Sequence, residues 1–145
     1  MRWIIALFVV VAVAVLARIY FNLRRIRRAN QRGDWDAQQI QHLRALGSDP
    51  FKEHVVDFFF GLPSEPACAA VSAALEHEGF AVDAKPVPEA VDEPFSLHAT
   101  RSMRLSVPDM QELSRRFGEL AESHGGRYDG WAAGVVPQDA GASQR

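Results

Sequence analysis

His54-Val55-Val56-Asp57-Phe58-Phe59-Phe60 is the stretch on which the fold of this chain depends. It is short, β-branched and aromatic, which favours a strand at the centre of a sheet. Gly61-Leu62-Pro63-Ser64 follows it and breaks the strand. Ser64 is a good helix N-cap, and Glu65 and Pro66 suit the first turn of a helix. The sequence therefore predicts a central strand followed directly by a helix.

Two further strands are predicted downstream of this helix. Gly79 is placed to end the helix, and the alternation over Phe80–Val87 indicates a half-buried strand. An acidic, proline-bracketed loop follows. A strictly alternating run over Phe95–Leu105 then predicts a strand with His98 on its polar face.

The last helix and the last strand close the pattern. Ser106 with Asp109 three residues later is a variant of the capping box that begins a helix. One face of this helix carries Met110, Leu113, Phe117, Leu120 and His124. Gly125-Gly126 stops the helix, and Arg127–Val136 is predicted as the final strand.

A short helix is predicted ahead of these elements, over Trp35–Leu46. Ile40, Leu43 and Leu46 recur at helical spacing, and a Gly47-Ser48-Asp49-Pro50 turn follows. The remaining order is β-α-β-β-α-β, which is the ferredoxin-like, split β-α-β pattern. We therefore predict an α+β fold with one four-stranded antiparallel sheet and both of its helices on one face. Such a fold carries many functions and decides none of them.

The N-terminus predicts a membrane anchor. Trp3–Leu23 is apolar apart from Arg18 and Asn22, and as a helix it would cover about 30 Å, the thickness of the hydrocarbon core. Four arginines follow within residues 24–28. By the positive-inside rule, the N-terminus faces out and the rest of the chain is cytoplasmic. The prediction is a single-pass protein of the bacterial inner membrane.

A cleaved signal peptide is the alternative, because Ala12-Val13-Ala14 resembles a cleavage site. Against it, a signal peptide carries its positive charge before the apolar core and not after it. The predicted organisation is an anchor with its basic flank over residues 1–28 and a hinge over residues 29–34. One α+β domain over residues 35–137 and a disordered tail over residues 138–145 complete it.

Charge separates the predicted anchor from the domain. Residues 1–28 hold six arginines and no acid, so the rest of the chain has 16 − 6 = 10 basic residues against 18 acidic ones, a net charge of −8. This sign argues against direct nucleic-acid binding, which needs a basic face. It suits a basic protein partner. The single cysteine, Cys68, fits a reducing compartment and predicts a buried, inert thiol.

Motifs for catalysis, metals or cofactors are missing from the sequence. The five histidines show no metal-ligand spacing, and we find no phosphate-binding glycine loop and no nucleophile elbow. Acylphosphatases share the predicted fold, but they bind phosphate in a loop after the first strand with the help of an arginine. Here that loop, Gly61–Glu65, has no arginine and carries an acid. We therefore predict no catalytic residue, no metal and no cofactor; an enzyme would need His98 or Asp129 in a pocket.

Two short segments carry a family resemblance in combination. One is the Gly47–Pro50 turn, and the other is Tyr128-Asp129-Gly130-Trp131, which opens the last strand. With His54 on the first strand and the element order above, they resemble the regulator of ribonuclease E activity B (RraB) family. These proteins are small inhibitors of the RNA-degrading endonuclease RNase E. The resemblance covers roughly residues 36–136.

The resemblance implies a domain without an active site that binds the C-terminal, scaffold-forming part of RNase E and lowers its activity. It places candidate partner-binding residues at Tyr128, Asp129 and Trp131, with Asp49 next. Core packing of Trp131 and turn formation by Asp49 and Asp129 are the alternatives for these residues. Familiar members are soluble and end in a long acidic tail, whereas this chain has a predicted anchor and ends in Gly141–Arg145.

A periplasmic domain that recognises peptidoglycan is the alternative function, since it would also combine one anchor with a small sheet domain. The four arginines after the apolar stretch argue against it, because they place the domain in the cytoplasm.

Overall fold

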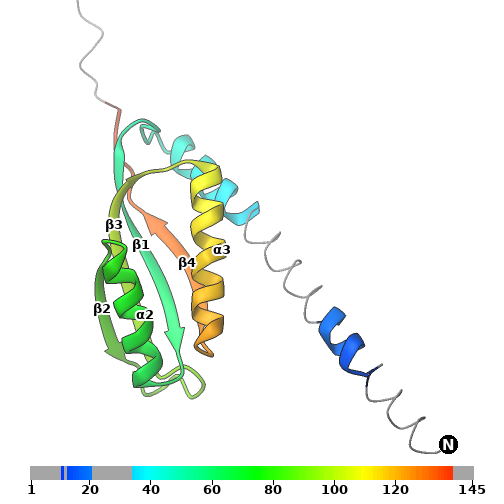
Figure 1. Cartoon of the computed structure of the whole chain (residues 1–145). Helices are drawn as coiled ribbons and strands as arrows, with labels where there is room; N and C mark the ends of the chain where they lie inside the picture. The colour runs from blue at the N-terminus through cyan, green and yellow to red at the C-terminus, as the bar shows by residue number, and fades with distance from the viewer. Residues whose placement is uncertain (1–10, 12, 21–33, 139–145) are drawn as a thin grey trace, which may run out of the picture.

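The computed structural model describes residues 11, 13–20 and 34–138. A leading helix (residues 34–45) precedes the sheet domain (Figure 1). The domain then runs through β1 (Glu53–Leu62), α2 (Glu65–His77), β2 (Ala81–Pro86), β3 (Phe95–Arg104), α3 (Val107–Ser123) and β4 (Arg127–Ala133). The predicted β-α-β-β-α-β order is confirmed.

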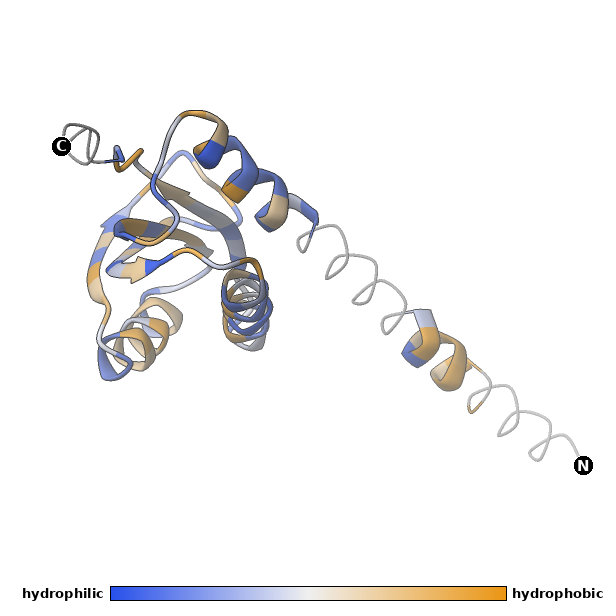
Figure 2. Cartoon of the chain, turned by 90° about the horizontal axis from the view of Figure 1, so that it is seen from above, coloured by the Kyte–Doolittle hydropathy of each residue, from blue (hydrophilic) through white to orange (hydrophobic). Residues whose placement is uncertain are grey.

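The four strands form one sheet in the order β2-β3-β1-β4, and every neighbouring pair is antiparallel. The central pair, β1 and β3, is in register from Glu53 opposite Arg104 to Leu62 opposite Phe95. Helices α2 and α3 lie on the same face of the sheet (Figure 2). This is the split β-α-β arrangement predicted above.

The predicted helix caps are present. The Ser64 hydroxyl accepts a hydrogen bond from the backbone N–H of Ala67 at 3.3 Å, and Ser106 accepts one from Asp109 at the same distance. Each satisfies a backbone donor that the first turn of a helix leaves unpaired. Gly79 follows α2 with a φ of +89°, a conformation that favours glycine.

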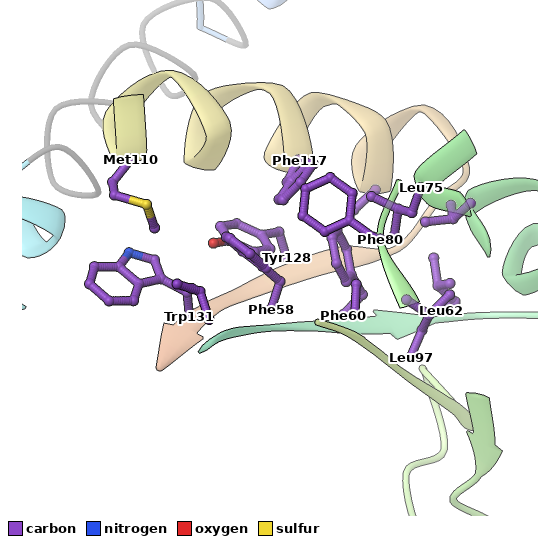
Figure 3. Close-up of a cluster of buried hydrophobic side chains, with 14 of the residues drawn as sticks. Phe58, Phe60, Leu62, Leu75, Phe80, Leu97, Met110, Phe117, Tyr128 and Trp131 are labelled. Carbon is purple, nitrogen blue, oxygen red and sulfur yellow. The ribbon is translucent and has the colours of Figure 1, made fainter. Parts of the chain in front are cut away.

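Aromatic side chains fill the space between the sheet and the two helices (Figure 3). The alternation of β1 sends Val56, Phe58 and Phe60 inward, and all three are fully buried. Phe117 of α3 meets Phe58 edge to face, with ring centroids 5.1 Å apart. Such a pair stabilises the core by about 1 kcal/mol beyond its buried area.

Three sequence expectations differ from the structure at the edges of the domain. Strand β2 lies at the edge of the sheet and is mostly exposed; of the alternating residues, Phe80 is buried just before the strand and Val82 is half-buried, but Ala84 is exposed. Leu46 is 57% exposed because the leading helix ends at residue 45 and the apolar stripe stops at Leu43. The last strand ends at Ala133 instead of Val136.

The predicted anchor, hinge and tail fall mostly outside the described residues. Of the apolar stretch over residues 3–23, the structure describes residues 11 and 13–20. The hinge contributes Asp34 and the tail contributes Gln138. Within the described part of the chain, no helix combines the length and the apolar character that a membrane span needs.

Candidate functional site

Trp131, a predicted binding residue, is buried at one end of the core (Figure 3) and is 2% exposed. Its indole Nε1–H donates a hydrogen bond to Oδ1 of Asp36 at 2.8 Å. Trp35 of the leading helix packs edge to face against it, with ring centroids 5.8 Å apart. Trp131 therefore joins β4 to the leading helix.

Asp36 is a fully buried carboxylate and the centre of this junction. Its Oδ1 also accepts a hydrogen bond from the hydroxyl of Ser114 on α3, at 2.9 Å. One side chain therefore fixes the leading helix to both β4 and α3.

Asp36 and Ser114 are not among the residues predicted from the sequence, although their spacing carries a signal. Asp36 precedes Ile40 and Leu43 at the i, i+4, i+7 positions of one helix face. Ser114 is the middle residue of the corresponding stripe on the last helix, four residues after Met110 and three before Phe117. A polar residue within a buried stripe indicates a hydrogen-bonded core position.

Tyr128 is also part of the core, with 4% of its surface exposed. Its ring lies against Phe60 and Phe117, at centroid distances of 5.2 and 5.8 Å (Figure 3). Neither Tyr128 nor Trp131 presents its ring to solvent. Of the predicted residues on β4, Asp129 is the exposed one.

Asp129 lies at an irregularity in the sheet. Gly130 pairs with Phe59 and Tyr128 with Phe60, so Asp129 is the extra residue of a β-bulge on β4. Its carboxylate accepts a hydrogen bond from Nε of Arg127, and Arg127 also pairs with Glu93 at 3.1 Å. The carboxylates of Asp129 and Glu93 hold the pKa of Arg127 above its ordinary value.

Gly130 is where the leading helix comes closest to β4. Its φ of +108° favours glycine, and an added Cβ would lie 3.3 Å from Cη2 of Trp35. The glycine of the Tyr128–Trp131 segment therefore both completes the bulge and admits the Trp35 ring.

A groove of about 650 Å³ runs along the outer edge of β4; we call it the β4 groove. It is lined by residues 126–130, by Trp35 and Asp36, by Ser114 and Glu122 of α3, and by Glu93. Trp35 is 40% exposed. The rim is acidic, with Glu93, Glu122 and Asp129 against the single cation of Arg127.

Asp49 lies outside the β4 groove, in the turn between the leading helix and β1. Its Oδ1 accepts the backbone N–H of Phe51 at 2.9 Å, and its own N–H donates to the carbonyl of Val136 at 2.8 Å. These are the contacts of a turn-forming aspartate. The structure thus brings three of the predicted residues together at β4 and leaves Asp49 elsewhere.

Two further kinds of chemistry can be assessed, metal binding and the reactivity of the cysteine. Across the described residues, no three histidine, cysteine, aspartate or glutamate side chains are grouped as metal ligands. Cys68 is buried, and this burial raises the pKa of its thiol. A raised pKa lowers the fraction of reactive thiolate.

Comparison with known families gives one result that covers most of this domain. Residues 34–133 match the family model described as "Regulator of ribonuclease activity B". No curated protein matches the chain. The match spans the leading helix and every strand of the sheet. Proteins of this family are non-enzymatic regulators of RNase E, so the prediction that the chain is not an enzyme is confirmed. The chain belongs to the RraB family, the regulators of ribonuclease activity B.

Proposed function

We propose that this protein binds RNase E, or a related ribonuclease, through the β4 groove and lowers its activity. The observation that carries the proposal is that Tyr128, Asp129 and Gly130 line one wall of an acidic groove. Asp129 is the residue of this segment that contacts the partner. Tyr128 and Trp131 position the groove from within the core.

Charge supports a basic partner segment. The chain after residue 28 has a net charge of −8, and Glu93, Glu122 and Asp129 concentrate this charge at the rim of the groove. Complementary charge across an interface steers association and selects partners. The proposed binding region is the C-terminal scaffold region of RNase E. In the RNase E partners of the proteins that this chain resembles, this region carries basic RNA-binding segments. Direct nucleic-acid binding is not part of the proposal, because these carboxylates repel phosphate.

Residues 1–28 are the proposed tether, with the N-terminus outside and the domain in the cytoplasm. Four arginines after an apolar stretch of spanning length support this orientation. A tether raises the local concentration of the domain at the membrane. Removing residues 1–28 should weaken regulation in cells and leave binding in solution unchanged. A reporter fused after Arg145 that is active only in the periplasm would reverse the orientation.

The binding proposal is tested with the full chain in detergent micelles. The measurements are its affinity for RNase E, with and without the C-terminal scaffold region, and the rate of RNA cleavage. Changing Asp129→Asn together with Glu122→Gln should weaken binding about fivefold, mainly through slower association at low salt. Removing the scaffold region should abolish binding.

A matched control keeps the total charge the same as in this variant. Glu112→Gln with Glu119→Gln also removes two negative charges, but these residues pair with Arg115 on α3 and do not line the groove. This control should bind as the parent chain does. Equal weakening by both double variants would mean that overall charge, and not the β4 groove, sets the affinity.

A further inference from the structure

The face of the sheet opposite α2 and α3 carries a second candidate surface, which we call the outer sheet face. Alternation along β1 sends Val55, Asp57 and Phe59 to this face. Val55 is 57% exposed and Phe59 is 38% exposed. No described helix buries these two side chains, so the centre of the sheet is open to solvent here.

An aromatic pair lies at the centre of the outer sheet face. Phe59 on β1 and His98 on β3 are directly opposite each other in the central strand pair. Their rings are stacked, with centroids 5.1 Å apart and planes 3° from parallel. The two rings form an offset stack that bridges the two innermost strands and stays partly exposed.

Two carboxylates lie beside this pair: Asp57 contacts His98, and Asp83 is its neighbour on β2. Oδ1 of Asp57 lies 3.0 Å from Nε2 of His98, and the Thr100 hydroxyl donates to the same oxygen at 3.0 Å. Within the described residues, both contacts reach Oδ1, which leaves Oδ2 as a further acceptor. Asp83 on β2 is opposite His98 in register and makes an exposed pair with Lys85 at 3.1 Å. An exposed pair of this kind is weak and can exchange partners.

We propose that the outer sheet face binds an arginine of a protein partner, with the guanidinium packed against the Phe59–His98 stack and hydrogen-bonded to Asp57. A guanidinium is planar, it stacks on aromatic faces, and its donors match a carboxylate in pairs. A lysine ammonium lacks the plane and the fork. This surface is separate from the β4 groove and does not depend on its function.

Two other occupants fit the outer sheet face less well. Aromatic side chains on central strands also stack RNA bases in some sheet domains. Here the phosphates would meet Asp57 and Asp83, in a chain whose net charge after residue 28 is −8.

A second copy of the chain needs more area: four strands cover roughly 19 Å by 33 Å, or about 600 Å². A stable interface takes about 800 Å² from each partner.

The experiment titrates the full chain in detergent micelles with two heptapeptides of alternating glycine that carry either three arginines or three lysines. Signals of the His98 ring and of the Phe59 amide are followed by NMR. The arginine peptide should bind about tenfold more tightly than the lysine peptide, and it should shift these signals. Phe59→Leu and Asp57→Asn should each remove most of this preference.

Matched variants separate the site from its surroundings. Phe51→Leu makes the same change at a phenylalanine that is 80% exposed in the turn before β1. Glu112→Gln removes one charge from α3. Both should bind the arginine peptide like the parent chain, and unchanged unfolding midpoints show that all four variants are folded.

Two results would overturn the proposal. Equal affinity for both peptides, insensitive to Phe59→Leu and Asp57→Asn, would reduce the interaction to general attraction by an acidic chain. A uridine oligonucleotide that shifts the His98 and Phe59 signals when the arginine peptide does not would assign the face to nucleic acid.

Discussion

The leading helix is attached to the sheet domain at both of its ends, and the two attachments use different polar groups. At its first turn, the Asp36 carboxyl group accepts hydrogen bonds from Ser114 and Trp131. Beyond its last turn, the Ser48 hydroxyl lies 2.6 Å from Nε2 of His54 and accepts the backbone N–H of Val136 at 3.0 Å. One attachment is centred on a fully buried acidic side chain, and the other on a hydroxyl and an imidazole.

At the second attachment, each ring nitrogen of His54 has a partner. Nδ1 of His54 lies 3.0 Å from the carbonyl oxygen of Lys52, which can only accept, so Nδ1 carries a proton. Nε2 lies beside the Ser48 hydroxyl. Asp36, in contrast, is the acceptor shared by two buried donors, the Trp131 indole and the Ser114 hydroxyl. Loss of Asp36 would leave both donors buried without it, so the end of the helix beside the β4 groove should be the more sensitive to loss of its polar group.

Asp36→Ala should have the largest effect on stability. The change removes two buried hydrogen bonds and leaves the Trp131 indole and the Ser114 hydroxyl without their acceptor. We expect a loss of about 3 kcal/mol in the free energy of unfolding. Chemical unfolding followed by tryptophan fluorescence measures it.

Asp34→Ala is the control for this prediction, because Asp34 is an exposed acid two residues earlier in the same helix. It should change the free energy of unfolding by less than about 0.5 kcal/mol. Equal losses for both variants would show that charge near the start of the helix matters and that the buried contacts do not.

The sequence predicted the sheet and its helices well, because period-two and helical patterns with Ser64 and Ser106 as caps are local signals. Which residues contact a partner stays a prediction. The family resemblance makes Trp131 and Tyr128 candidates, and the structure shows that both rings are buried in the core. The pairing of Asp36 with Trp131 joins residues 95 positions apart, which no local pattern specifies.

His54→Ala should have the second-largest effect. It removes a buried ring and its hydrogen bonds to Ser48 and to the Lys52 carbonyl, but Ser48 keeps its contact with Val136. We expect a loss of about 2 kcal/mol, less than for Asp36→Ala because Ser48 keeps a partner when His54 is removed. His42→Ala, at an exposed position of the leading helix, is the control and should be nearly silent. A loss larger than that of Asp36→Ala would reverse the ranking of the two attachments.

Gly130→Ala is a smaller change, and it tests the close approach of Trp35, at the start of the leading helix, to β4. The new Cβ would need a φ near +108° and would lie 3.3 Å from the Trp35 ring. The left-handed conformation alone costs an L-residue about 1 kcal/mol, and a shift of Trp35 would alter the wall of the β4 groove. Gly134→Ala is the matched control, because its Cβ meets nothing within 4 Å. Unfolding midpoints and RNase E affinity should fall together in the Gly130 variant and stay unchanged in the Gly134 variant. A Gly130 variant that loses stability but keeps its full affinity would separate the attachment from the groove, and would move the binding site away from this end of the helix.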